Sequence, residues 1–279
     1  NNNYSNNQNP YAQPYQDYAS NIKNPNSTSS YTIPVQNPYV SRQEEVEQVK
    51  YNQVEVQKEN VQTILKSAEG FEIVTDKEIY KSKAVIIASG SKHNPMSIPG
   101  EEKYLGQGVS YCAVCDGNFF KNQEVAVIGN NNVAIEEAIY LLNLVKKLYF
   151  ICPESNLLGS DENISKIQNY ENVEFLYNSK VDEIKGDDFG VTSIQVGNKE
   201  IPVFGVFPYL GVKTTTQILS NLKPNMVNGF VITDENMMSN IEGLFAAGDV
   251  RLKKVKQLIT AAGDGAIAAT NAFNYIKKD

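Results

Sequence analysis

An apolar strand, a tight turn and the start of a helix follow one another in Glu124-Val-Ala-Val-Ile-Gly-Asn-Asn-Asn-Val-Ala134. The apolar run 125–128 is typical of a strand. Helical spacing continues over residues 135–144, and a second apolar run at 148–151 predicts the next strand. A strand, a crossover helix and a parallel strand form a βαβ unit, so we expect an α/β fold of the nucleotide-binding kind.

Two cysteines precede this unit, in Ser110-Tyr-Cys-Ala-Val-Cys-Asp-Gly117. Cys112 and Cys115 have the Cys-x-x-Cys spacing, which lets two thiols close into a small disulfide ring and reopen in two-electron chemistry. The same spacing also serves zinc sites, and it arises by accident. The neighbouring βαβ pattern favours the redox interpretation over the other two.

Three blocks of sequence carry a resemblance to a known family: Gly108-Val-Ser-Tyr-Cys-Ala-Val-Cys-Asp-Gly117, Gly243-Leu-Phe-Ala-Ala-Gly-Asp249 and Lys256-Gln-Leu-Ile-Thr-Ala-Ala-Gly-Asp-Gly265. From about residue 49 onward the chain resembles the low-molecular-weight thioredoxin reductases. These flavoproteins pass electrons from NADPH through FAD to a Cys-x-x-Cys pair and on to thioredoxin. The resemblance implies a nested, two-domain, Rossmann-like α/β fold, an FAD-dependent oxidoreductase and a thioredoxin-like protein disulfide as partner.

The resemblance also implies an order of domains. Residues 46–107 and 241–279 form a partial FAD-type domain, and residues 108–240 are inserted into it as a pyridine-nucleotide-type domain that carries the Cys-x-x-Cys pair. Within the insert, short apolar runs predict strands at 173–176, 191–196 and 203–207. The apolar run 84–89 is expected to lead out of the FAD-type domain.

The beginning of the chain differs from the rest. Residues 1–40 are rich in Asn, Tyr, Pro, Ser and Gln and contain no Gly. Such a stretch buries too little apolar surface to offset the entropy of ordering, so residues 1–45 are predicted to be a disordered tail. The tail is either an inert linker or a tyrosine-rich interaction segment. The tail stands where the family has its Gly-rich FAD fingerprint, so the FAD-type domain is predicted to be truncated. The sequence is then either a fragment or processed chain, or the product of a gene in which a tail replaced this part of the FAD site.

The resemblance assigns roles around the thiols. It implies that Cys115 lies against the flavin and that Cys112 is the thiol that attacks the partner disulfide. The thiolate is the reactive form of a thiol, so one of the two cysteines is expected to have a lowered pKa. Asp116 is expected to move the proton. The alternative for Asp116 is a helix cap before the next residue, Gly117.

The remaining cysteine and the single histidine are given no catalytic role. His93 lies in a polar, Pro-containing loop and is predicted to be a surface residue. Cys152 follows an apolar strand and is predicted to be a small buried residue rather than a third redox thiol.

The FAD site implied by the resemblance has two parts. Asp249 would bind the ribitol, and residues 256–258 would approach the flavin end. The complete set of FAD residues is Gly90, Gly248, Asp249, Lys256, Gln257 and Leu258. Small residues at helical spacing in the last helix predict close packing, which is the alternative explanation for that block: Leu258, Ala261, Ala262, Gly265, Ala268 and Ala272.

The pyridine nucleotide site departs from the family pattern. Gly129 and Ala134 keep the ends of the Gly-rich turn, but Asn fills the positions between them. Because Asn tolerates the left-handed backbone region, the turn is expected to survive with poorer access for phosphates. Beyond the next strand, the family's Arg clamp for the NADPH 2′-phosphate is replaced by residues 152–154 and by Leu158. Glu154 suits a ribose diol or is a solvated loop residue. We therefore expect NADH or a ferredoxin-like donor rather than NADPH.

Composition limits the partners and the compartment. The 279 residues carry a net charge of -7, which gives no electrostatic reason to expect nucleic acid or an anionic membrane. No apolar run approaches the roughly 20 residues that span a bilayer, and no secretory segment opens the chain. Three cysteines with one Cys-x-x-Cys pair indicate the cytoplasm.

An open sheet edge and the homodimers that the family commonly forms favour a homodimer. A second hypothesis is a catalytically inactive homologue that serves as a structural or interaction protein through its tail.

Overall fold

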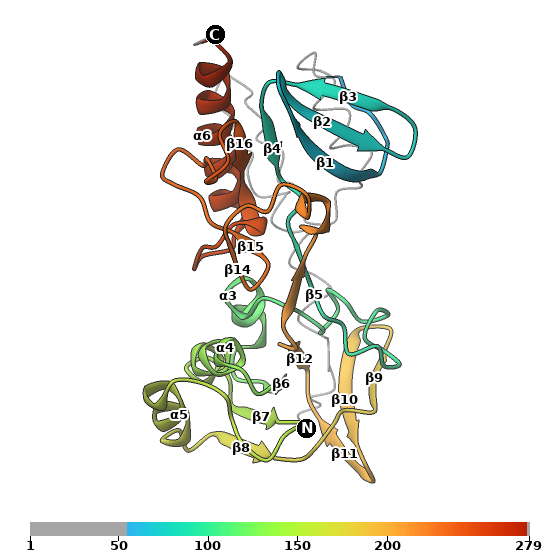
Figure 1. Ribbon diagram of the computed structural model, residues 1–279. Helices are drawn as coiled ribbons and strands as arrows, with labels where there is room; N and C mark the ends of the chain where they lie inside the picture. Colours follow the sequence, from blue (N-terminus) through green and yellow to red (C-terminus); the bar gives the residue numbers. More distant parts are fainter. Residues whose placement is uncertain (1–54, 278–279) are drawn as a thin grey trace, which may run out of the picture. The chain divides into compact units, whose positions relative to one another are not determined.

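The computed structural model describes residues 55–277, which divide by packing into two compact units (Figure 1). Unit 1 is His93–Val212, and unit 2 contains residues 55–92 and 213–277. The chain passes between the units through β5 (Ser91–His93) and β13 (Val212–Thr214), which pair with each other. The predicted tail, residues 1–45, lies outside the described residues. No helix of the described part is long and apolar enough to cross a membrane.

Unit 1 is built on a four-stranded parallel sheet with the order β12, β6, β7, β8. Its strands are β6 (Glu124–Ile128), β7 (Lys147–Ile151), β8 (Val173–Leu176) and β12 (Gly205–Pro208). The crossover helices are α4 (Asn132–Leu142) and α5 (Asp161–Gln168). The βαβ unit predicted from residues 124–151 is therefore confirmed, as is the strand at 173–176.

The two faces of this sheet pack into different cores because successive strand residues point to opposite sides. Val125 and Val127 contact the apolar residues of α4 and α5. Ala126 and Ile128 contact an antiparallel sheet instead. That sheet consists of β9 (Glu183–Asp187), β10 (Gly190–Val196) and β11 (Lys199–Pro202). Both faces of the parallel sheet are covered, which is why its strands are mostly apolar.

Unit 2 combines an antiparallel sheet, a parallel strand pair and a long helix. The antiparallel strands are β1 (Val61–Ser67), β2 (Gly70–Thr75) and β3 (Ile79–Ser82). The parallel pair is β4 (Val85–Ile87) with β16 (Leu244–Ala246), the helix is α6 (Leu258–Ile276), and β14 (Met226–Val227) and β15 (Phe230–Val231) form a hairpin. Along β16, Leu244 packs with the residues of β1 and β2, whereas Phe245 packs with Ala268 of α6.

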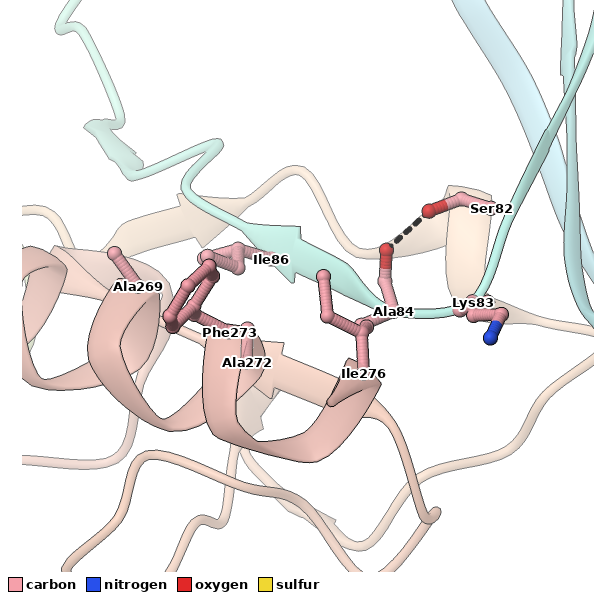
Figure 2. Close-up of a pocket in the computed structure, with 8 residues that line it drawn as sticks. All are labelled: Ser82, Lys83, Ala84, Ile86, Ala269, Ala272, Phe273 and Ile276. Atoms are coloured by element: carbon pink, nitrogen blue, oxygen red, sulfur yellow. Dashed lines mark hydrogen bonds between the residues drawn. The ribbon is translucent and has the colours of Figure 1, made fainter. Parts of the chain in front are cut away.

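An apolar hollow of about 450 Å³ lies between β4 and α6 (Figure 2). Figure 2 shows Phe273 and Ile276 of the helix beside Ile86 of the strand. These three side chains remain exposed by 38% or more. The predicted close packing of α6 is found at Ala268, which is fully buried, but not at Leu258, which is 79% exposed.

The limits of the units differ from the predicted domain limits at residues 108 and 240. Tyr104 is buried in the same core as β9 and β10, so the segment before 108 packs with unit 1. Leu219 and Val231 are buried in the core of unit 2, so the segment before 240 packs there. Packing thus changes from one unit to the other near residues 93 and 212. The assignment of FAD-type and pyridine-nucleotide-type domains stays a prediction.

Candidate active site

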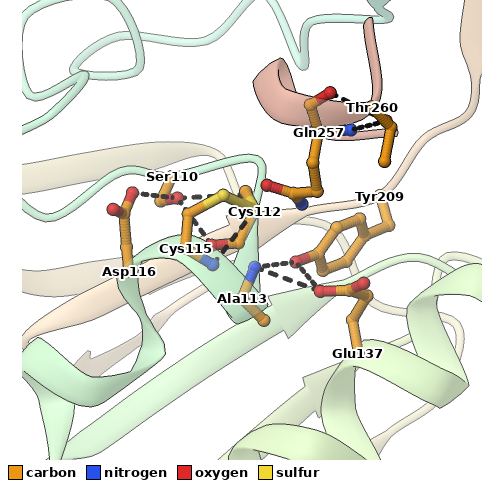
Figure 3. Close-up of a disulfide and its surroundings, with 9 residues drawn as sticks. All are labelled: Ser110, Cys112, Ala113, Cys115, Asp116, Glu137, Tyr209, Gln257 and Thr260. Atoms are coloured by element: carbon orange, nitrogen blue, oxygen red, sulfur yellow. Dashed lines mark hydrogen bonds between the residues drawn. A yellow bond between two sulfur atoms is a disulfide. The ribbon is translucent and has the colours of Figure 1, made fainter. Parts of the chain in front are cut away.

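The thiol pair lies on a single helical turn of unit 1. Cys112 and Cys115 form a disulfide across α3 (Ala113–Asp116), with their Cα atoms 5.3 Å apart (Figure 3). The Cys115 N–H donates to the Cys112 Sγ at 3.1 Å. Ala113 is fully buried, whereas Val114 and Cys115 are exposed. The buried alanine anchors the turn, and Val114 and Cys115 form its exposed side.

The carboxylate of Asp116 is held beside this turn by Ser110. The Ser110 Oγ donates to the Asp116 Oδ2 at 2.6 Å and accepts the Cys112 N–H at 3.1 Å. The Asp116 side chain makes no capping hydrogen bond to the following 3₁₀ turn, Gly117–Phe120, within the described part. The capping alternative for Asp116 is therefore wrong, because its carboxylate bonds backward to Ser110 instead.

A second carboxylate approaches the other side of the turn. The Ala113 N–H donates both to the Tyr209 Oη at 3.0 Å and to the Glu137 Oε2 at 3.1 Å. The Tyr209 hydroxyl donates to the same Glu137 oxygen at 3.2 Å. Burial and then the Glu137 charge raise the pKa of Tyr209, so its hydroxyl stays protonated. Figure 3 shows both side chains directed at Ala113.

A buried carboxylate also supports the residue before the first cysteine. Glu101, 6% exposed, accepts the Tyr111 hydroxyl at 2.6 Å and the backbone N–H groups of Met96 and Ser97. The His93 ring stacks on Tyr111, with centroids 4.8 Å apart. His93 is exposed, as predicted, although its stacking partner is adjacent in sequence to Cys112.

The predicted nucleotide turn forms between β6 and α4. Gly129 takes a φ of +152°, and a Cβ there would lie 2.8 Å from the Tyr209 carbonyl oxygen. Asn131 caps α4 by accepting the Ala134 N–H at 3.0 Å, and its amide donates to the same carbonyl at 2.6 Å. None of the asparagines at 130–132 adopts a positive φ. The turn thus survives, but through Gly129 and a capping side chain rather than through left-handed Asn.

The loop after β7 lies against this turn. The Leu158 N–H donates to the Asn130 carbonyl at 2.6 Å. Glu154 is exposed on the same loop, and its carbonyl accepts the Asn178 N–H. Cys152 is fully buried at the end of the strand, which confirms its predicted environment, and burial raises the pKa of its thiol.

In unit 2, a pocket of about 280 Å³ brings together three of the predicted FAD residues, Gly90, Gly248 and Asp249. The Asp249 Oδ1 is buried, and no hydrogen-bond partner reaches it within the described part of the chain. The nearest cation, the Lys253 Nζ, is 3.9 Å away. A buried, unpaired carboxylate oxygen is costly unless a donor reaches it. The hydroxyl groups of a polyol chain such as ribitol would supply that donor, so these residues fit the FAD that the family implies.

The block at 256–258 is arranged around this pocket in part. The Lys256 Nζ donates to the Asp249 carbonyl at 3.0 Å and lies 3.3 Å from the centroid of the Phe230 ring. Burial lowers the pKa of Lys256. Gln257 and Thr260 form the capping box of α6. Leu258 is largely exposed and does not line the pocket.

A buried ion cluster lies under the turn that presents Asp249. Asp264, 9% exposed, accepts the Gly248 N–H at 3.0 Å, the Arg251 Nη1 at 2.7 Å and the Lys253 Nζ at 2.9 Å. Burial alone would raise the pKa of Asp264, but these donors together hold it below its usual value.

Sequence reasoning did not single out Ser110, Glu137, Tyr209 or Asp264. Ser110 and Asp264 stand inside the quoted blocks, so the blocks contained a signal for them. Glu137 lies 24 residues and Tyr209 lies 96 residues from Ala113, and no local pattern connects them.

Comparison with known proteins gives a consistent result. The family model described as pyridine nucleotide-disulphide oxidoreductase matches residues 2–265. A thioredoxin reductase of Listeria innocua is 38% identical over an alignment of 225 residues, which covers 78% of this chain and 70% of that protein. A thioredoxin reductase of Listeria monocytogenes is 40% identical over 212 residues, 74% of this chain and 66% of that protein.

Solved structures agree with the sequence comparison. Thioredoxin reductase from Streptococcus pyogenes has a TM-score of 0.81 at 35% identity, covering 85% of this chain and 79% of that one. Thioredoxin reductase from Giardia duodenalis has a TM-score of 0.80 at 30% identity, covering 84% and 80%.

Proposed function

Because this chain belongs to the pyridine nucleotide-disulphide oxidoreductase family, we propose that it works as a thioredoxin reductase-like flavoprotein. It passes electrons through FAD to the pair Cys112 and Cys115 and on to a protein disulfide. The observation that carries the proposal is the disulfide on α3, with the carboxylate of Asp116 fixed nearby by Ser110. Thiol–disulfide exchange uses a reversible disulfide and a group that donates a proton to the leaving sulfur.

The FAD-binding residues are Gly90, Gly248 and Asp249 of the pocket, with Lys256, Gln257 and Leu258 toward the flavin end. The Asp249 Oδ1, which has no hydrogen-bond partner among the described residues, supports a hydrogen bond from a ribityl hydroxyl. The two glycines, at φ of +66° and +75°, leave the backbone bare on the pocket wall. When bound, FAD supplies a two-electron carrier that the amino acid side chains lack.

The two sulfurs have different tasks in this proposal. Cys115 exchanges electrons with the flavin, and Cys112 attacks the disulfide of the partner, as in the family that the chain resembles. Asp116 gives a proton to the sulfur that leaves and takes one from the thiol that attacks. The exposed side of α3, with Val114 52% exposed, offers a contact surface for a protein substrate.

The electron donor is NADH or a ferredoxin-like protein rather than NADPH. The loop after β7 supplies Glu154 and no Arg for a 2′-phosphate, and Gly129 and Ala134 flank a turn whose anion-binding end carries the Asn131 side chain. These features support weak binding of the 2′-phosphate that distinguishes NADPH from NADH. The partner is a thioredoxin-like protein disulfide, the compartment is the cytoplasm, and the assembly is a homodimer.

The test is the visible spectrum of the purified full chain after incubation with FAD and removal of the excess. We expect the absorption of a bound, oxidised flavin, and D249A should retain much less of it. D188A, which removes an exposed aspartate of unit 1, is the matched control and should retain as much as the wild type. A folded, colourless wild-type protein would reject the flavoenzyme and leave the inactive interaction protein.

The donor is tested separately by adding NADH or NADPH to the flavin-loaded protein without oxygen. We expect NADH, or a reduced ferredoxin, to bleach the flavin. We expect the same concentration of NADPH not to bleach it. Equal bleaching by NADPH would show that the interpretation of Glu154 and Leu158 is wrong.

A further inference from the structure

Ser110 connects the first cysteine to the carboxylate of Asp116. Its side chain is buried, at 7% exposure, and its hydroxyl makes both contacts at once (Figure 3). The Oγ donates its proton to the Asp116 Oδ2 at 2.6 Å. The same oxygen accepts the Cys112 N–H at 3.1 Å.

The position of Ser110 is fixed by the parallel sheet. Its N–H donates to the Val206 carbonyl of β12 at 3.0 Å, and Val109 before it is 1% exposed in the core of unit 1. The backbone around Asp116 is tied to the same place, because the Asp116 N–H donates to the Cys112 carbonyl at 3.1 Å. The hydroxyl is therefore held by core structure, and the carboxylate is held by the hydroxyl.

We propose that Ser110 is a positioning residue whose hydroxyl orients the Asp116 carboxyl group for proton delivery to the sulfur that leaves when the disulfide opens. The inference rests on the proposed function, in which Asp116 is the proton donor. It adds a residue that acts through Asp116. A carboxyl group free to rotate would spend much of its time in unproductive orientations.

The step can be followed with dithiothreitol as the reductant. A thiolate of the reagent attacks one sulfur of the pair, the bond between Cys112 and Cys115 breaks, and its electron pair goes to the leaving sulfur, which takes a proton from Asp116. The second thiol of the reagent then attacks the mixed disulfide and passes its proton to the released protein sulfur. The reagent leaves as a cyclic disulfide, two electrons have entered the pair, and Asp116 regains its proton from water.

A double-mutant cycle on this reaction separates positioning from simple support of the fold. The full chain without added flavin is reduced by dithiothreitol, and the cyclic product is followed by its ultraviolet absorption. S110A should be roughly tenfold slower than the wild type, and D116N roughly 100-fold slower. The double variant should be as slow as D116N alone, because the hydroxyl has nothing left to orient.

The chain offers a matched control in Ser193. It is 4% exposed on β10 and donates to the Glu200 Oε1 at 2.7 Å, so S193A removes the same kind of buried serine–carboxylate bond in the same unit. S193A should reduce at the wild-type rate. S110T keeps a hydroxyl and should restore most of the rate lost in S110A. Thermal melting checks each variant, and S110G replaces S110A if that variant melts early.

Three results would overturn the inference. The first is an S110A variant that is reduced at the wild-type rate. If D116N is still reduced slowly, this result leaves the proposed function intact. The second is an S110A effect that persists at full size in the D116N background, which would mean that the hydroxyl acts without Asp116. The third is wild-type speed in D116N, which removes the donor role of Asp116 itself, whereas the flavin spectrum tests the rest of the function independently.

Discussion

Tyr209 shows how one residue can serve two sites in unit 1. Its hydroxyl accepts the Ala113 N–H in α3, the thiol turn that carries the disulfide, and its carbonyl accepts the Asn131 amide at the turn between β6 and α4. The side chain is 4% exposed, so neither bond competes strongly with water. The thiol turn and the start of α4 are therefore fixed by the same buried residue.

Replacing this tyrosine by phenylalanine should destabilise the fold by about 1 kcal/mol. The loss is limited because the Ala113 N–H keeps its second partner, Glu137, at 3.1 Å. Urea unfolding measures the change. Y104F is the control, since Tyr104 is also buried and, within the described residues, its hydroxyl accepts from the Lys103 Nζ and donates to no carboxylate. Equal costs for Y209F and Y104F would contradict the role given to the Tyr209 hydroxyl.

The buried Asp264 should make the stability of the fold depend on pH. Its folded pKa is depressed, so its contribution to stability is present above the unfolded pKa of about 3.9 and is lost as the pH falls through the folded value. D264N should cost about 3 kcal/mol at neutral pH, because Arg251 and Lys253 lose their buried partner.

The difference in unfolding free energy between wild type and D264N should therefore shrink below about pH 4. Urea titrations at neutral and acid pH measure it, with exposed Asp188 as the control in D188N. A difference that stays constant with pH would show that the ion cluster does not depend on the Asp264 charge.

The sequence was informative about single residues only where a motif contained them. Cys112, Cys115 and Asp116 were singled out because chemistry ties their types to their spacing. Glu137 and Tyr209 were not, because their contacts with Ala113 are made by folding and leave no periodic or local trace.

Among the elements, the turn from β6 to α4 depends most on one backbone position. Gly129 combines a positive φ with close approach to the Tyr209 carbonyl, so a Cβ meets strain and overlap together. Gly197 also has a positive φ, of +55°, but nothing lies within 4 Å of its Cβ position.

G129A should therefore destabilise the chain by roughly 3 kcal/mol or more, whereas G197A should cost about 1 kcal/mol from backbone strain alone. Chemical unfolding of both variants gives the comparison. Similar costs for the two would mean that the turn relaxes away from the carbonyl.

Sequence periodicity predicted most strands of unit 1 because those strands are mostly apolar and bounded by turn residues, whereas the polar strands β9 and β11 were not predicted. It failed at the asparagines of the turn, where a side chain caps the helix and the backbone stays out of the left-handed region. It also failed for part of α6, since spacing marks a face but does not say what covers it, and Leu258 is exposed.

Across the whole molecule, each unit has apolar cores of its own. Leu148 is fully buried in unit 1, and Leu244 is 1% exposed in unit 2. Separate cores favour separate unfolding steps.

Calorimetry should show two transitions, with L148A lowering one and L244A lowering the other, each by about 3 kcal/mol. Added FAD should raise only the transition that L244A lowers, because its pocket is lined by unit 2. A single transition that both variants lower equally would contradict this prediction.

The α/β class and the family were within reach of the sequence, because the quoted blocks are specific and the strand pattern is regular. The limits of the units were not, because residues 96–107 and 213–240 carry little periodicity and join a unit only through tertiary contacts such as those of Tyr104 and Leu219.

The complete burial of Cys152 makes it possible to measure the oxidation state of the pair Cys112 and Cys115 by counting labelled thiols. An alkylating reagent applied to the native protein should pass over that thiol, since it is both shielded and poorly ionised. Every label seen by mass spectrometry then belongs to Cys112 or Cys115, and a mass gain of two labels corresponds to one stored electron pair.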